Sequence, residues 1–332
     1  KYRDLGRTMI LLISETPVAG TVARLAKWLG HFFGKPCHPI IMRNYPNNSF
    51  RIPMGAFSSL PAWPDVLKDL VERAELIVIH NIYAKSQANN LIYDVVFNCA
   101  PPKAKILFQV HSPPLEAPGG LYRPLNDYPF HRSLVIAQGY GRFLPDAVSV
   151  PNVVPDATYP FAIKKDRTIL LPHMRSTEFR WSGKVTEADH HRLEESTPFS
   201  NGYAVTNIHE IFGREAVTHE EVMLRLAATS IVVDDINTGL MHQTTIEGLK
   251  TGCYVLSGAD MYTIEQMCET LQMDLPPVEL VGGINDVIYH LSDPHLDKRV
   301  HEMREKATAF SDKFLAEERL ARIYYEQLKT AL

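Results

Sequence analysis

The sequence predicts a two-domain α/β protein, and three observations lead to this prediction. The chain has 332 residues, about twice the length of an ordinary domain. Short apolar runs alternate with segments of helical periodicity, which is typical of βαβ units built on a parallel sheet. Between residues 150 and 166 the alternation lapses, and this segment holds three prolines and no helical period. We interpret it as a linker between two domains.

The expected boundaries follow from this lapse. We expect an N-terminal Rossmann-like domain at 1–150, a linker at 151–166 and a C-terminal Rossmann-like domain at 167–310. A C-terminal helix at 311–332 has an apolar face and is able to pack back on the N-terminal domain. Ligands of open α/β sheets bind outside the carboxyl ends of the strands, so two such sheets facing each other would enclose the site in a cleft.

The apolar runs and helical stripes give each half its elements. In the first half the expected strands are 8–14, 39–42, 76–80, 105–110 and 134–137, and the expected helices are 22–33, 65–74 and 86–99. Residues 44–64 and 113–129 are expected to be long loops. In the second half the expected strands are 168–171, 202–206, 230–234, 253–257 and 278–281, and the expected helices are 185–195, 218–228, 243–251, one from 261 and a helical end at 284–332.

Composition narrows the class of protein. The 34 basic and 38 acidic residues give a net charge of −4, which does not indicate a non-specific nucleic-acid binder, although a local basic groove stays open. No apolar run is long enough to span a bilayer, and residues 1–7 lack the apolar core of a signal peptide. The four cysteines form no CxxC motif. We therefore expect a cytoplasmic protein with free thiols and leave its oligomeric state open.

The loop after the strand at 230–234 is the strongest candidate site. The strand ends in Asp234-Asp235, a loop with Gly239 follows, and a helix begins near Gln243. The amino end of a helix behind a flexible glycine favours an anion such as a diphosphate. Thr244 and Thr245 are placed to cap this helix. Glu247 is placed to accept from ribose hydroxyls, or it is simply a carboxylate that stabilises the helix dipole.

Two further groups of residues follow other strands. Arg175, Arg180 and Lys184 come after the strand at 168–171, where cations suit a departing diphosphate, although a solvated basic loop has the same composition. In the first half, His80-Asn81 and His111 stand at strand ends. Gly20 precedes the first helix, but the G-x-G-x-x-G fingerprint is absent, which disfavours a nicotinamide dehydrogenase. Asp234-Asp235 raises the question of magnesium, and we expect no metal and no other cofactor.

This arrangement resembles the GT-B glycosyltransferases, and in particular their large retaining group, the family 4 or group 1 type. The resemblance rests on Pro151–Pro155 at the domain junction, on Arg175 and Lys184, and on the run from Thr238-Gly239 through Ile246-Glu247-Gly248 to Gly252. It implies a metal-independent, retaining hexosyltransferase that uses a nucleotide-diphosphate sugar, such as a UDP-sugar, as co-substrate.

The resemblance also implies roles for single residues. Glu247 would bind the donor ribose, aided by Thr244, and the diphosphate would be held by Arg175, Lys184 and the backbone of Gly239 and Leu240. His111 and Gly239 would be the catalytic positions, and the acceptor side would hold Gly20, His80 and Asn81. The family has an acidic residue eight positions before the ribose glutamate, where this chain has Gly239.

Several functions stay open at this point. The first is sugar transfer to an unidentified hydroxyl. A nucleic-acid base bearing a hydroxyl is not indicated as the acceptor, but it is not excluded. The second is a nucleotide-sugar epimerase or hydrolase that uses the same site. The third is a catalytically inactive nucleotide-sugar binding module, because the family's acidic residue is missing at Gly239.

Overall fold

The fold is described from a computed structural model. It covers residues 9–44, 57–60, 62–82, 87–112, 123–156, 165–171, 185–196, 202–207 and 218–332. The chain divides into two compact units. Unit 1 comprises Lys1–Ile136, Tyr140–Val153 and Ala321–Leu332, and unit 2 comprises Ala137–Gly139 and Val154–Leu320.

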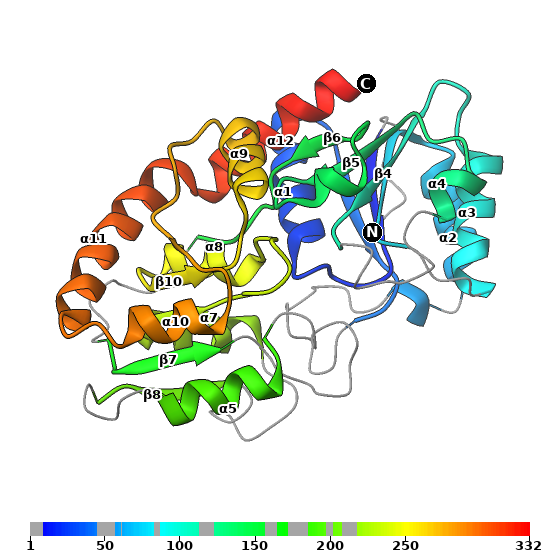
Figure 1. The fold of residues 1–332 in the computed structure, drawn as a ribbon. Coiled ribbons are helices and arrows are strands. Elements are labelled where there is room, and N and C mark those ends of the chain that lie inside the picture. Colours follow the sequence, from blue (N-terminus) through cyan, green and yellow to red (C-terminus); the bar gives the residue numbers. More distant parts are fainter. Residues whose placement is uncertain are drawn as a thin grey trace. The chain divides into compact units, whose positions relative to one another are not determined.

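Unit 1 contains a six-stranded parallel sheet in its described residues (Figure 1). The strand order is β2-β1-β3-β4-β5-β6. The strands are β1 (Met9–Ser14), β2 (Cys37–Ile41), β3 (Ala74–His80), β4 (Lys105–Val110), β5 (Arg132–Ile136) and β6 (Val148–Val150). The helices of this unit are α1 (Thr21–Phe33), α2 (Trp63–Val71), α3 (Gln87–Cys99), α4 (Arg123–Asp127) and, from Ala321 on, α12 (Glu317–Ala331), with short 3-10 turns at Phe57–Ser59 and Tyr140–Phe143.

Unit 2 repeats the same topology with five parallel strands in its described part. The strand order is β11-β10-β9-β7-β8. The strands are β7 (Thr168–Leu171), β8 (Ala204–Asn207), β9 (Ile231–Val233), β10 (Tyr254–Ser257) and β11 (Glu279–Leu280). The helices are α5 (Glu187–Ser196), α7 (His219–Ala228), α8 (Gln243–Lys250), α9 (Met261–Leu271), α10 (Ile284–Leu291) and α11 (Leu296–Phe314).

The predicted fold class is therefore confirmed: each unit is a doubly wound α/β sheet. In each sheet the two strands that come first in the sequence lie on one side, and the later strands lie on the other side. The strand order reverses between β1 and β3 in unit 1 and between β7 and β9 in unit 2. Such switch points, at the carboxyl ends of the strands, are where sheets of this kind bind ligands.

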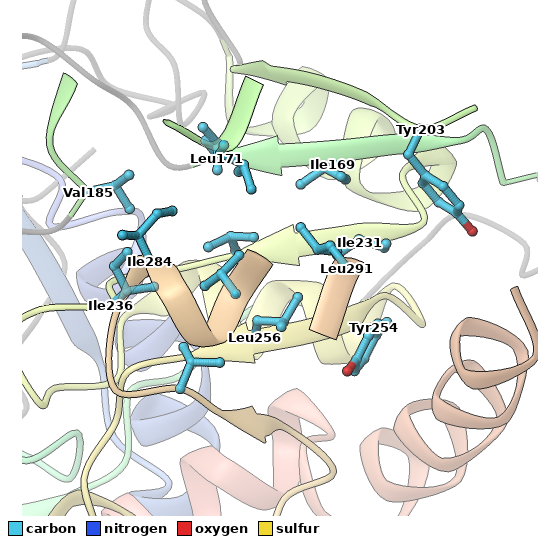
Figure 2. Packing of buried hydrophobic residues seen from close by; sticks show 14 of the residues in the cluster. Ile169, Leu171, Val185, Tyr203, Ile231, Ile236, Tyr254, Leu256, Ile284 and Leu291 are labelled. Carbon is cyan, nitrogen blue, oxygen red and sulfur yellow. The ribbon is translucent and has the colours of Figure 1, made fainter. Parts of the chain in front are cut away.

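The cores explain why the apolar runs become strands. All six residues of β1 are buried, as expected for a parallel strand covered on both faces. In unit 2 the core joins β7, β9 and β10 to α5 and α10, and Figure 2 shows Ile169, Ile231 and Leu256 in this layer. Helix α1 buries Val22, Leu25, Ala26 and Leu29, leaves Phe33 half-buried, and ends at Gly34, which takes a left-handed conformation.

The C-terminal end differs from the single helical stretch expected at 284–332, because it forms three helices, α10, α11 and α12. The break between α11 and α12 has a tertiary cause. The buried ammonium of Lys250, at the end of α8, donates to the carbonyls of Leu315 (2.8 Å) and Val154 (3.2 Å) and to Asp156 Oδ1 (3.0 Å). Asp156 Oδ1 also accepts from the backbone N–H of Glu317, which begins α12 (2.8 Å). These contacts replace helical hydrogen bonds at the break.

From Ala321 onward, helix α12 belongs to unit 1. Tyr324 is completely buried, and its hydroxyl donates to Gln109 Oε1 of β4 (2.6 Å). Tyr325 lies against Phe32 and Phe33 of α1, with ring centroids 5.5 and 4.7 Å apart.

The expected loop at 113–129 contains α4 in its described part, and the expected linker is preceded by strand β6. The four cysteines are free, and none of the described helices is long and apolar enough to cross a membrane.

Candidate functional site

The loop that follows β9 is organised by Asp235. Its Oδ1 accepts from the backbone N–H groups of Asn237 and Thr238, both at 2.9 Å. Its Oδ2 accepts from the Thr238 hydroxyl and, at 2.7 Å, from His242 Nε2. Burial acts to raise the pKa of Asp235, but the hydrogen bonds from His242 and Thr238 outweigh it and hold the pKa below its usual value. The carboxylate is therefore charged at neutral pH and fixes the shape of the loop.

The neighbouring carboxylate of Asp234 joins this loop to α8. Its Oδ2 accepts from the Thr245 hydroxyl (2.6 Å) and from the backbone N–H of His242 (3.3 Å). Its Oδ1 is buried without a hydrogen-bond partner. Among the described residues, no group of three or more His, Cys, Asp or Glu side chains is placed to hold a metal ion. The two aspartates that raised the question of magnesium thus serve as internal hydrogen-bond acceptors.

Gly239 and Leu240 lie in the middle of the same loop. Gly239 has a φ of 75°, in the left-handed region that favours glycine. Its carbonyl accepts from the Thr263 hydroxyl (2.6 Å) and from the backbone N–H of Asp260 (3.1 Å), both at the start of α9. Leu240 is buried. These two hydrogen bonds fix the Gly239 backbone to the start of α9, at the carboxyl edge of the sheet.

The amino end of α8 has no side-chain cap. Its N-cap residue is His242, which makes no capping hydrogen bond. The expectation that Thr244 or Thr245 caps this helix is wrong, because both lie inside the first turn and Thr245 donates to Asp234 instead. The N–H groups of a first helical turn have no partner within their own helix. An uncapped end therefore favours an anion at this point.

Glu247 lies in the second turn of α8 and is 4% exposed. Its Oε1 accepts from His219 Nε2 (2.6 Å) and from Gln243 Nε2 (2.5 Å). In the described part of the chain, its Oε2 accepts no hydrogen bond. One oxygen is thus held by the protein, and the other is left for a ligand with hydroxyl donors.

In unit 1, two histidines meet at the carboxyl edge of the sheet. His80 ends β3 and His111 directly follows β4, and His80 Nδ1 lies 2.9 Å from His111 Nε2. Both side chains are buried. Burial, reinforced by His111, lowers the pKa of His80 well below its usual value, and burial lowers the pKa of His111 to about 3. Both imidazoles are therefore neutral at physiological pH.

Asn81 fixes the backbone beside this pair. Its Oδ1 accepts from the backbone N–H of His111 (2.6 Å), and its Nδ2 donates to the Ser112 hydroxyl (3.2 Å). Asn81 has a φ of 51°, an uncommon left-handed conformation for a residue other than glycine. Such strained backbone is found most often at functional sites. The sequence predicts that His80-Asn81 and His111 lie at strand ends, and the structure places them at the ends of β3 and β4.

Gly20 lies at the other strand of the same switch point, at the N-cap of α1. Val18, Ala19 and Gly20 are consecutive left-handed residues with φ values of 48°, 52° and 79°. The Arg24 side chain donates to the carbonyl of Ala19 (2.7 Å) and stabilises this turn. The turn before α1 is thus held in an uncommon conformation, and the acceptor-side position of Gly20 stays a prediction.

Two predicted donor-site residues, Arg175 and Lys184, lie outside the described residues. Sequence reasoning missed His219 and Gln243 as partners of Glu247. Gln243 stands four residues before Glu247, and this spacing places two side chains on one helix face. His219 carries no local signal of this kind. The helix that it begins has a capping box, with Thr218 and Glu221 bonded reciprocally.

Comparison of the sequence with protein-family models and with curated proteins finds no match. The fold has solved counterparts. An alpha-glucosyltransferase in complex with UDP and a 13-mer DNA with a central A:G mismatch is 11% identical, with a TM-score of 0.66, and the match covers 97% of this chain and 99% of that one. HepE from Anabaena, in complex with UDP and glucose, is 11% identical with a TM-score of 0.55, over 98% and 100% of the two chains.

A third counterpart is a putative UDP-N-acetylglucosamine 2-epimerase from Listeria monocytogenes. It is 12% identical with a TM-score of 0.52, and the match covers 94% of each chain. At these identities the likeness concerns the fold. The chain has the GT-B fold of two Rossmann-like units, as the sequence predicts.

Proposed function

We propose that this chain is a glycosyltransferase that moves a sugar from a nucleotide-diphosphate sugar to a hydroxyl group. The observation that carries the proposal is the state of Glu247. Its Oε1 is held by His219 and Gln243, while its Oε2 accepts nothing in the described structure. A carboxylate oxygen presented in this way suits the adjacent hydroxyls of a ribose, each of which would donate one hydrogen bond.

The diphosphate would bind beside this carboxylate. The uncapped first turn of α8 offers backbone N–H groups and the positive end of the helix dipole. The Thr244 hydroxyl lies in the same turn and adds a further donor. In our proposal Arg175 and Lys184 supply the cations, and the backbone at Gly239 and Leu240 closes the phosphate site. UDP is the nucleotide to test first, because it is bound in two of the structures of the same fold.

In this scheme the protein acts chiefly on the leaving group. Negative charge grows on the diphosphate as the bond to the sugar breaks, and fixed donors and cations stabilise that charge in the transition state. We propose that the reaction retains the anomeric configuration and needs no metal ion. These two points are tested by NMR spectroscopy of the product anomer and by turnover in the presence of EDTA against added Mg²⁺.

A hydroxyl-bearing base in DNA is the acceptor to test first. The supporting observation is the match over nearly the full length of both chains to an alpha-glucosyltransferase that binds DNA. The net charge of −4 argues for a few local phosphate contacts rather than a broad basic surface. Transfer of radiolabelled glucose from UDP-glucose to DNA with hydroxymethylated cytosine, against unmodified DNA and simple sugars, tests this acceptor.

The proposal as a whole is tested by calorimetry and turnover with UDP-sugars. Glu247→Ala should weaken donor binding at least tenfold, because a charge-assisted pair of hydrogen bonds is worth roughly 1.5–3 kcal/mol per bond. Lys184→Ala should lower turnover while the fold survives. Glu265→Ala, at an exposed position of α9, is the matched control and should behave as wild type. Wild-type donor affinity and turnover in both site variants would refute the site.

A second candidate is a nucleotide-sugar epimerase, because one structure of the same fold is a putative UDP-N-acetylglucosamine 2-epimerase. Incubation with the donor alone separates the two functions. Conversion of the sugar without any acceptor would identify an epimerase, and release of free sugar would identify a hydrolase. Tight donor binding with no turnover on any acceptor would identify a binding module.

A further inference from the structure

The hydrogen bond between His80 and His111 has a direction that the structure allows us to assign. Each neutral imidazole carries one N–H and one lone pair. His80 Nδ1 faces His111 Nε2 at 2.9 Å, so one of these two nitrogens carries the shared hydrogen. If His111 were the donor, the hydrogen of His80 would be on Nε2. If His80 is the donor, its Nε2 carries only a lone pair.

The second arrangement is favoured by the surroundings of His80 Nε2. This atom is buried and has no hydrogen-bond partner. A buried N–H without an acceptor is the rarer and costlier defect, whereas an acceptor without a donor is better tolerated. His80 therefore keeps its hydrogen on Nδ1 and donates it to His111 Nε2. Because His111 Nε2 is then an acceptor, the hydrogen of His111 is on Nδ1.

The free end of this pair is His111 Nδ1. Across the described residues this atom makes no hydrogen bond, and it is not among the polar atoms that are fully buried without a partner. The ring is also fixed from its own backbone, because the N–H of His111 donates to Asn81 Oδ1. His111 thus presents one N–H donor in a set orientation at the carboxyl edge of the unit 1 sheet.

We propose that His80 is a positioning residue that holds His111 as a neutral Nδ1–H donor for an oxygen atom of the substrate. The matching ligand group is an uncharged oxygen, such as a sugar hydroxyl or ring oxygen. In this form His111 Nε2 is already occupied, so His111 does not take a proton from the attacking hydroxyl. The inference rests on the proposed function for the identity of the ligand but not for the direction of the hydrogen bond.

The direction is tested on the wild-type protein without any substrate. Long-range ¹H–¹⁵N spectra of ¹⁵N-histidine-labelled protein distinguish the two neutral forms of an imidazole, and His111→Gln assigns the signals. We expect a protonated Nδ1 and an unprotonated Nε2 for His111, with a protonated Nδ1 for His80. The opposite pattern, with hydrogen on His111 Nε2, would overturn the inference and leave the proposed glycosyl transfer untouched.

The consequence is tested with two substitutions at His80. Asparagine carries an N–H near the position of Nδ1. His80→Asn should therefore keep the spectrum of His111 with a protonated Nδ1, which we call the His111 signature, and stay within about threefold of wild-type kcat. His80→Leu removes the donor and should lower kcat about tenfold with the donor KM little changed. Tyr324→Phe, which removes another buried hydrogen bond of unit 1, is the control and should keep kcat.

Two kinetic outcomes would contradict the inference. One is a folded His80→Leu protein with wild-type kcat and an unchanged His111 signature. The other is an equal loss of kcat in folded His80→Asn and His80→Leu. Circular dichroism establishes folding, and if His80→Leu does not fold, the wild-type spectrum alone decides. Absence of sugar transfer in every protein would count against the proposed function, while the spectrum would still decide the hydrogen-bond direction.

Discussion

His219 Nε2 donates a hydrogen bond to Glu247 Oε1 across 2.6 Å and joins the first residue of α7 to the second turn of α8. Both side chains are largely buried. The two residues are 28 positions apart in sequence, so the packing of the two helices brings them together. The carboxylate that we assign to the donor ribose is therefore oriented by a residue on a different helix.

Loss of this contact should weaken donor binding. His219→Ala leaves Glu247 with one fixed partner, Gln243, and a hydrogen bond to a charged group is worth roughly 1.5–3 kcal/mol. We expect a roughly tenfold or greater rise in the donor dissociation constant, measured by calorimetry with UDP. His219→Gln, whose amide N–H approximates Nε2, should recover part of the affinity. An equal loss in both variants would show that the hydrogen bond does not orient Glu247.

Gly258, directly after β10, has no room for a side chain beside the loop after β9. A Cβ there would lie 2.5 Å from the Cα of Ile236 and 2.7 Å from the carbonyl oxygen of Asp235. These are backbone atoms of the loop after β9, so they cannot move without distorting the loop. Gly258→Ala should cost about 1–3 kcal/mol or more in unfolding free energy and also weaken donor binding.

The control for this change is Gly282→Ala. Its new Cβ would meet only the end of the Asp286 side chain, at 3.1 Å, which needs to shift by just a few tenths of an ångström while it keeps its hydrogen bond to the N–H of residue 282. We expect thermal unfolding close to that of the wild type for this variant. Equal thermal midpoints for the two alanine variants would mean that the loop after β9 accommodates a side chain at Gly258.

The His80–His111 pair should make the fold sensitive to acid. Burial lowers the pKa of both groups in the folded chain, to about 3 for His111, whereas an unfolded histidine titrates near 6.5. Below pH 6.5 the unfolded state therefore binds more protons, and stability falls by up to about 1.4 kcal/mol per pH unit for each histidine. His111→Gln should flatten the fall in thermal midpoint between pH 7.5 and 5, whereas His301→Gln, at an exposed position, should leave the slope unchanged.

Tyr324 should make the fold sensitive to alkali. Burial, with a smaller effect from Cys37, raises the pKa of Tyr324 in the folded chain, whereas an unfolded tyrosine ionises near pH 10. Above pH 10 the unfolded state loses its proton first, so stability falls as pH rises. Tyr324→Phe should lower the unfolding free energy by about 1–2 kcal/mol at neutral pH, because Gln109 loses its donor. From pH 9.5 to 11, however, the thermal midpoint of this variant should fall less steeply than that of the wild type.

The comparison variant is Tyr289→Phe. Tyr289 is 76% exposed, so its replacement should change neither the midpoint at neutral pH nor its alkaline slope. A parallel decline of the wild type and Tyr324→Phe above pH 10 would show that another group controls alkaline unfolding.

Strand ends were the part of the site that the sequence could predict. Apolar runs locate parallel strands, and a polar residue that follows such a strand, such as Asp235 in unit 2 or His111 in unit 1, must then lie at the carboxyl edge of its own sheet. The capping box at Thr218 was equally readable, because its two partners are three residues apart. These inferences depend only on local periodicity and chain direction.

Contacts between distant segments could not be predicted in this way. The pairing of His219 with Glu247 depends on how α7 packs against α8. The break between α11 and α12 has no glycine or proline to announce it. It is caused by Lys250, which binds the Leu315 carbonyl. The turn at Val18 and Ala19 is left-handed, a conformation that residues of these types rarely adopt. Their conformational preferences therefore gave no indication of it.

Lys250 and Glu247 stand three residues apart on α8, and this spacing limits how the helix can vary in length. Lys250 binds the carbonyl of Val154, which begins the long segment of unit 2, and the carbonyl of Leu315, which lies between α11 and α12. One residue inserted between Glu247 and Lys250 would rotate their side chains by about 100° relative to each other. Insertions and deletions among relatives of this chain should therefore spare the interval from 247 to 250.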